Sequence, residues 1–194
     1  ALSNGICSLN PKVDRLTMTA EIDFDHDGRP TKKSFYESVI KSAERMTYTN
    51  VKKLIDGDDA AIKSRYAHIL ADIKLMAELA KKLTARRFEQ GSIDFDLPEP
   101  QIIIDIKGKV EDIVRSERNE AHKLIEEFML SANRAVAEEF SRRGLPFIYR
   151  IHEPPDEESV SEFADFIATF GIKFTPGGPK SFQEALAKFD GRPE

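Results

Sequence analysis

The chain has 194 residues, of which 40% are hydrophobic, and its formal net charge is −5. This size allows one substantial core, and the acidic balance argues against a non-specific nucleic-acid binder, which is usually basic. No apolar run approaches the roughly 18 residues of a membrane span, and the single cysteine, Cys7, excludes an internal disulfide. A soluble, cytoplasmic protein without a membrane partner is therefore expected.

The first predicted unit is a β-hairpin. Apolar and polar residues alternate over 13–24, which predicts a half-buried strand. A turn at 26–30 and a returning strand at 33–40 complete the hairpin. The core side of the first strand is expected to hold Leu16, Met18, Ala20, Ile22 and Phe24.

Two helices are expected next. A short one covers 49–56, with Thr49 as its N-cap and Gly57 at its end. A single long one begins at Asp58 or Asp59, and cations in its last turns suit the helix dipole. Its buried face is expected to hold Tyr66, Ile69, Leu70, Ile73, Met76, Ala77, Ala80 and Leu83.

The second half of the chain predicts another hairpin followed by helices. Strands are expected at 102–106 and 110–114, and the run of three isoleucines indicates a strand covered on both faces. Hairpins followed by long helices, with few βαβ alternations, predict an α+β fold: an antiparallel or mixed sheet packed against several long helices. The other expected elements are a helix from 119 to 143, a strand at 147–152, a helix at 156–170, a short strand at 172–174 and a helix with a capping box at Ser181.

The helix at 119–133 has an apolar stripe, a solvated face and a polar border. Glu127 is expected on the solvated face, whereas His122 and Glu126 lie on the border, where a buried helix can present polar groups to a ligand. These two residues would touch at i, i+4 spacing. Because the H-E-x-x-H pattern is absent, zinc is not expected here. The apolar stripe consists of Ala121, Leu124, Ile125, Phe128, Met129 and Ala132.

An acidic run at residues 23–28 matches D-x-D-x-D-G, the first half of a calcium loop. The position that needs a bidentate glutamate holds Ser34, and Lys32 and Lys33 place cations where anions are required. An acidic surface turn is the simplest interpretation. A calcium-binding domain and a nuclease magnesium cluster are the alternatives.

Two aromatic residues stand outside the apolar stripes. Tyr48 precedes the expected helix cap, and Phe95 lies in a short polar-flanked segment. Proteins that bind single-stranded RNA stack bases on aromatic rings and recognise the 2′-hydroxyl through polar groups. Both rings therefore suit RNA binding, and burial in the core is the alternative.

Four segments carry a family resemblance. They read L-S-N-G-I-C-S-L-N-P at 2–11, R-M-T-Y-T-N-V at 45–51, R-N-E-A-H-K-L-I-E-E-F-M-L-S-A-N at 118–133 and Y-R-I-H-E-P-P at 149–155. In order and spacing they resemble the RNB catalytic domain of the ribonuclease II/ribonuclease R exoribonucleases, and ribonuclease R more closely. The resemblance covers essentially the whole chain. It implies processive, magnesium-dependent hydrolysis of single-stranded RNA from the 3′ end to nucleoside 5′-monophosphates.

The resemblance also implies roles for five RNA-binding residues. Tyr48 resembles the tyrosine that helps to select ribose, and Glu126 the helix carboxylate that works with it at the sugar. Phe95 resembles the aromatic residue that stacks near the 3′-terminal bases. Arg150 and His152 lie in the motif beside the RNA path.

The chain departs from the family in what it lacks. The Asp-rich magnesium motif would precede Leu2, an arginine-bearing motif would follow Glu194, and the flanking cold-shock and S1 domains are absent. Residues 1–194 are therefore expected to form a single partial RNB domain from a longer hydrolase, without a complete catalytic site or metal ligands. Alone, it is expected to be inactive and to bind no magnesium. A non-catalytic RNA-binding or interaction module is the alternative, and exposed strand edges favour a homo-oligomer.

Overall fold

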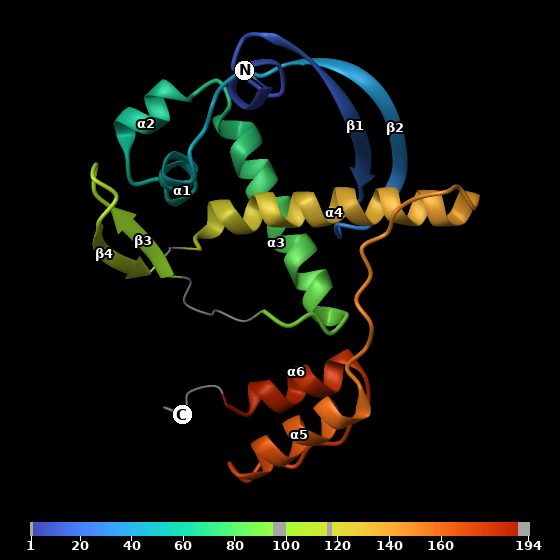
Figure 1. Ribbon diagram of the computed structural model, residues 1–194. Coiled ribbons are helices and arrows are strands. Elements are labelled where there is room, and N and C mark those ends of the chain that lie inside the picture. Colours follow the sequence, from blue (N-terminus) through green and yellow to red (C-terminus); the bar gives the residue numbers. More distant parts are fainter. Residues whose placement is uncertain (1, 95–99, 116–117, 190–194) are drawn as a thin grey trace. The chain divides into compact units, whose positions relative to one another are not determined.

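The computed structural model describes residues 2–94, 100–115 and 118–189. The chain divides into two compact units, one comprising Ala1–Leu83 and Arg118–Phe147 and the other Thr84–Glu117 and Ile148–Glu194. Each contains helices and, within the described residues, one two-stranded antiparallel sheet (Figure 1). The expected α+β fold is confirmed. No helix in the described ranges is long and apolar enough to cross a bilayer.

The sheet of the first unit is the predicted hairpin. Strands β1 (Asp14–Phe24) and β2 (Pro30–Lys41) pair antiparallel, with Leu16 opposite Val39. One carboxylate oxygen of Asp25 accepts hydrogen bonds from the backbone N–H groups of Asp27 and Arg29, at 2.9 and 2.8 Å. The acidic run thus closes a β-turn, as its composition predicts.

The exposed side of this hairpin differs from the prediction. Leu16 and Met18 are 87% and 78% exposed, so their placement in the core was wrong. The covered side at this end carries hydroxyl groups: Ser38 hydrogen-bonds to Thr17 at 2.8 Å and to Thr19 at 2.6 Å. Alternation shows which residues share a face, but the elements that pack against the sheet decide which face is covered.

Helices α1 (Tyr48–Asp56), α2 (Ala60–Arg65) and α3 (Leu70–Glu89) follow the hairpin. Thr47, and not Thr49, caps α1, because its side chain accepts from the N–H of Asn50. The single long helix that was predicted is two helices, since α2 ends at Arg65 and α3 begins at Leu70. Tyr66, which follows the end of α2, has its side chain buried in the first core. That core consists of Leu54, Tyr66 and Ile73, with Met46, Val51, Ile55, Ile62, Ile69, Leu70 and Met76 packed against it.

Helix α4 (Glu120–Arg143) packs against α1 and β1 (Figure 1). Asn119 caps its first turn and Gly144 ends it in the left-handed conformation, φ 62°, where glycine meets no steric penalty. The predicted helix is confirmed, but its buried face is rotated from the expected stripe. Glu127 is only 4% exposed, whereas Ile125 is 48% exposed, so the solvated position expected for Glu127 was wrong.

In the second unit, strands β3 (Pro100–Ile104) and β4 (Val110–Arg115) form the second predicted hairpin. Ile102 and Ile104 are 55% and 57% exposed, so the prediction of a strand covered on both faces was wrong within the part of the chain that the structure describes. A hydrophobic run predicts a buried strand only when other elements supply both covering layers.

Helices α5 (Glu157–Ala168) and α6 (Pro179–Ala187) complete the second unit. Asp156 caps α5 as predicted. Helix α6 begins after Gly178 with proline in its first turn, so the prediction of a capping box at Ser181 was wrong. The segments 147–152 and 172–174 are irregular, in contrast to the predicted strands. The second core joins Ile167, Ile172 and Ala185, with Phe163, Phe170, Phe174 and Phe189 packed around them.

Candidate nucleic-acid interface

Tyr48 is the first residue of α1 and is 47% exposed. The Thr47 cap fixes the backbone on which it stands, because the Thr47 hydroxyl accepts from the N–H of Asn50 at 3.2 Å. Its ring stacks on His122 of α4, with 3.8 Å between ring centroids and 21° between planes. The start of α1 is thus joined to the start of α4 by a near-parallel aromatic pair.

His122 lies in the first turn of α4 and also takes part in its cap. Its Nδ1 is 3.3 Å from the backbone nitrogen of Asn119 and 3.0 Å from the Asn119 side-chain oxygen. That same oxygen accepts from the N–H of Ala121 at 3.0 Å. The arrangement is a capping box in which histidine takes the place usually held by Glu or Gln.

Glu126 lies one turn further along α4. Both hydrogen bonds from Arg118 fall on its Oε2, at 2.7 Å from Nη2 and 3.3 Å from Nε. Among the hydrogen bonds of the described residues, none falls on Oε1 of Glu126, whose side chain is 33% exposed. Because residues at i and i+4 share a helix face, Glu126 and His122 lie on the same face of α4.

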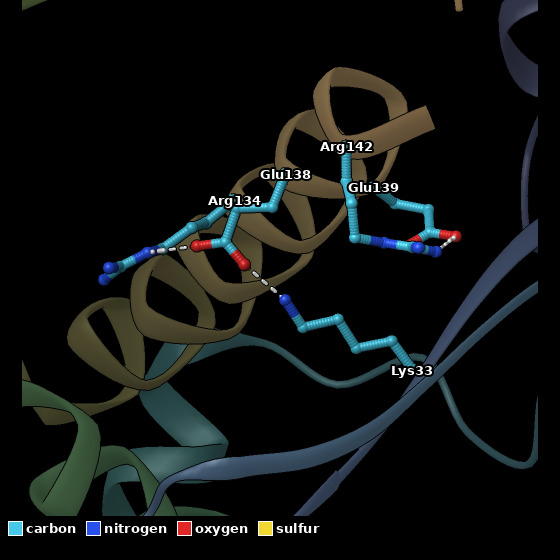
Figure 2. A network of polar contacts seen from close by, with 5 residues as sticks. All are labelled: Lys33, Arg134, Glu138, Glu139 and Arg142. Carbon is cyan, nitrogen blue, oxygen red and sulfur yellow. Dashed lines mark hydrogen bonds and ion pairs between the residues drawn. The ribbon is translucent and has the colours of Figure 1, made fainter. Parts of the chain in front are cut away.

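The far end of α4 carries a network of charges that ties the helix to the hairpin (Figure 2). Lys33 of β2 reaches one oxygen of Glu138, while Arg134 donates to the other at 2.9 Å. The hydrogen bond from Lys33 is the main cause that lowers the pKa of Glu138. Hydrogen bonds from Arg142 and then Arg143 lower the pKa of Glu139 in the same way.

Replacing Lys33 by methionine should reduce the loss of stability that the protein shows as the pH falls into the acid range. A lowered pKa in the folded state means that Glu138 stabilises the fold at neutral pH, and that this contribution is lost as pH falls below 4.5 and through the lowered pKa. Because Glu138 is half exposed, we expect a loss of about 0.2–1 kcal/mol at neutral pH. Melting temperatures of both proteins across pH should converge in acid.

Lys41→Met is the matched control for this experiment. Lys41 also lies on β2, but its nitrogen is 3.7 Å from Asp14 and both side chains are well exposed. We expect this variant to follow the wild-type profile at every pH. A Lys33→Met profile that runs parallel to wild type, without convergence in acid, would contradict the role of Glu138.

The acidic turn does not form a metal site. Among the described residues, no three His, Cys, Asp or Glu side chains are grouped so that they could hold a metal ion. Asp25 instead holds the turn, and Asp27 pairs with Arg29 at 3.1 Å. The carboxylate of Asp25 accepts from backbone N–H groups and that of Asp27 from an arginine, so both have a structural role in a surface turn.

The other three predicted residues lie outside the first unit or outside the described residues. Arg150 and His152 belong to the second unit, in the exposed irregular segment before α5. Phe95 lies outside the described residues. Sequence reasoning named Tyr48 and Glu126 but did not assign the partners that hold them, His122 and Arg118. The sequence does hold a signal for His122: it is a polar residue three positions after the N-cap residue Asn119, the spacing of a capping box.

Comparison with known protein families places the whole chain in context. The RNB domain model matches residues 1–194. The chain is 44% identical to ribonuclease R 1 of Lactococcus lactis subsp. lactis (strain IL1403), over 99% of this chain and 24% of that protein. It is 41% identical to ribonuclease R of Aquifex aeolicus (strain VF5), over 100% of this chain and 28% of that protein. The chain thus spans about a quarter of the length of these curated relatives.

Solved structures share the fold. Mycoplasma genitalium RNase R in complex with ribose methylated single-stranded RNA matches with a TM-score of 0.88 at 24% identity, over 99% of this chain and 30% of that chain. The same protein in complex with double-stranded RNA matches with a TM-score of 0.89 at 24% identity, over 99% of this chain and 34% of that chain. The architecture expected from the four sequence motifs is confirmed.

Proposed function

Because the chain belongs to the RNB-domain family, we propose that it is part of a 3′-to-5′ exoribonuclease that hydrolyses single-stranded RNA processively to nucleoside 5′-monophosphates. The observation that carries this proposal is the family match over the whole chain, together with ribonuclease R relatives at 41–44% identity. The complexes of Mycoplasma genitalium RNase R with RNA support RNA as the partner.

Within that enzyme, this chain forms a wall of the RNA channel that selects ribose. The support is the geometry at the start of α4. Arg118 bonds to Oε2 of Glu126, so Oε1 remains able to accept a hydrogen bond from a ribose 2′-hydroxyl. The half-exposed Tyr48 ring stacks on His122, which shares a face of α4 with Glu126. DNA lacks the 2′-hydroxyl, and the pair therefore favours RNA.

Base stacking and backbone contacts are assigned to the other three residues. Phe95 stacks near the 3′-terminal bases, and Arg150 and His152 lie beside the RNA path. Their family motifs support these roles, and the exposure of Arg150 and His152 leaves both accessible to RNA. An arginine can pair with a phosphate through two N–H groups.

Magnesium chemistry belongs to the full-length enzyme and not to this chain. The described residues offer no group of ligands that fits a magnesium ion, which prefers several oxygen donors from carboxylates and water. We propose that the metal ligands lie in the part of the longer protein that this chain does not cover, since the chain spans about a quarter of the length of its ribonuclease R relatives. The contribution of this chain is to bind and orient the RNA.

The purified 194-residue chain should release no mononucleotides from single-stranded RNA when magnesium is present. Product analysis by chromatography is the measurement, and the full-length protein under the same conditions should release nucleoside 5′-monophosphates. Mononucleotides from the chain alone would contradict the assignment of metal ligands elsewhere. An inactive full-length protein that still binds RNA would favour the alternative of a non-catalytic RNA-binding module.

The isolated chain is also expected to self-associate through the β1–β2 hairpin. Among the described residues each strand has one unpaired edge, and Leu16, Met18 and Val39 are exposed beside it. Sedimentation at increasing concentration should show a dimer, and Leu16→Lys should shift the equilibrium to monomer. Sedimentation of the wild-type chain as a monomer at every concentration would refute this expectation.

A further inference from the structure

Tyr48 depends on one neighbour for the orientation of its ring. Within the described part of the chain, its hydroxyl makes no hydrogen bond and its ring meets no aromatic residue other than His122. A tyrosine at the first position of a helix, 47% exposed, would otherwise rotate among several side-chain conformations. The near-parallel stack at 3.8 Å selects one of them.

The histidine beneath Tyr48 is itself held in place. Its Nδ1 faces both the backbone N–H of Asn119, at 3.3 Å, and the Asn119 side-chain oxygen, at 3.0 Å. An unprotonated Nδ1 accepts from the N–H, and a protonated Nδ1 donates to the oxygen. Asn119 thus holds the imidazole whichever ring nitrogen carries the proton.

We infer that His122 is a positioning residue: its ring fixes the plane of Tyr48, so that Tyr48 and Glu126 address the same ribose. This inference rests on the proposed function, because it assigns His122 a role only through the contact of Tyr48 with RNA. His122 lies one helical turn before Glu126 on the same face of α4. One short helix segment therefore supplies the carboxylate and also aligns the phenol that works with it.

The test compares His122→Ala with His122→Phe in the full-length protein. Both variants lose the Nδ1 contacts with Asn119, but phenylalanine keeps a flat ring that stacks on tyrosine, so the difference between them reports the stack alone. The readout is the ratio of degradation rates for matched RNA and DNA oligonucleotides. We expect His122→Ala to lower this ratio by about two- to tenfold and His122→Phe to stay close to wild type.

Tyr48→Ala separates this inference from the proposed function. If Tyr48→Ala leaves the RNA to DNA ratio unchanged, the proposed ribose contact of Tyr48 is wrong. If Tyr48→Ala lowers the ratio but His122→Ala equals wild type, or His122→Phe falls as far as His122→Ala, the positioning role is overturned.

A double variant tests whether His122 acts through Tyr48. Adding His122→Ala to Tyr48→Ala should lower the RNA to DNA ratio no further, because the ring that His122 aligns is already missing. Losses that multiply in the double variant would show that His122 contacts RNA independently, and would overturn the inference.

Discussion

Replacing Glu126 by alanine in the full-length protein is expected to lower the ratio of RNA to DNA degradation rates by about 10- to 100-fold. A hydrogen bond to a charged group contributes about 1.5–3 kcal/mol, and each 1.36 kcal/mol corresponds to about tenfold. In the structure, Arg118 engages only Oε2 of Glu126, which leaves Oε1 to accept from the 2′-hydroxyl. The loss should fall on RNA, because DNA never made this contact.

Glu120→Ala is the matched control for this variant. Glu120 is also a glutamate in the first turns of α4, paired with Lys123 at 3.5 Å on the surface. We expect its RNA to DNA ratio to equal that of wild type. An unchanged ratio in Glu126→Ala, measured with oligonucleotides of one sequence, would refute the ribose contact.

Local signals in the sequence predicted several helix ends correctly. Asp156 caps α5 as expected, Asp59 caps α2 and was one of two candidates for the start of a longer helix, and Gly57 ends α1 with φ 82°. Each of these features depends on a few neighbouring residues. A side chain that accepts from an N–H three positions away, or a glycine in the left-handed conformation, is visible in a short window of sequence.

Features that depend on distant elements were not predictable in the same way. The burial of Glu127 results from the packing of α4 against α1 and β1, which rotates its buried face from the stripe of apolar residues. The exposure of Leu16 has the same kind of cause, because no element of the described chain covers that end of the hairpin face. Periodicity reports amphipathicity, but packing partners decide burial.

In the candidate site, too, the sequence identified some residues and the structure was needed for the others. The motif resemblance pointed to Tyr48 and Glu126, which lie on two helices that contact each other. It did not reveal that a histidine and an arginine hold them, because those contacts depend on side-chain geometry between α1, α4 and the residue before the cap. The candidate site therefore includes His122 and Arg118 as well as Tyr48 and Glu126, because these two neighbours orient the side chains with family roles.

Replacing Leu54 by alanine is expected to cost about 2–5 kcal/mol in the free energy of unfolding. Leu54 is fully buried and packs in the core with Tyr66 and Ile73, so its truncation removes apolar contacts and leaves a cavity. It also lies on α1, the helix that begins with Tyr48. Loosening this helix should disturb the Tyr48–His122 stack as well as the core.

Leu75→Ala provides the comparison, because Leu75 is 66% exposed on α3 and alanine is the strongest helix former. We expect its free energy of unfolding to lie within about 0.5 kcal/mol of wild type. Denaturant titration of the 194-residue chain measures both variants. Equal midpoints for Leu54→Ala and Leu75→Ala would contradict the core placement of Leu54, whereas a large loss for Leu54→Ala alone would tie the stability of α1 to the residues that hold the candidate ribose site.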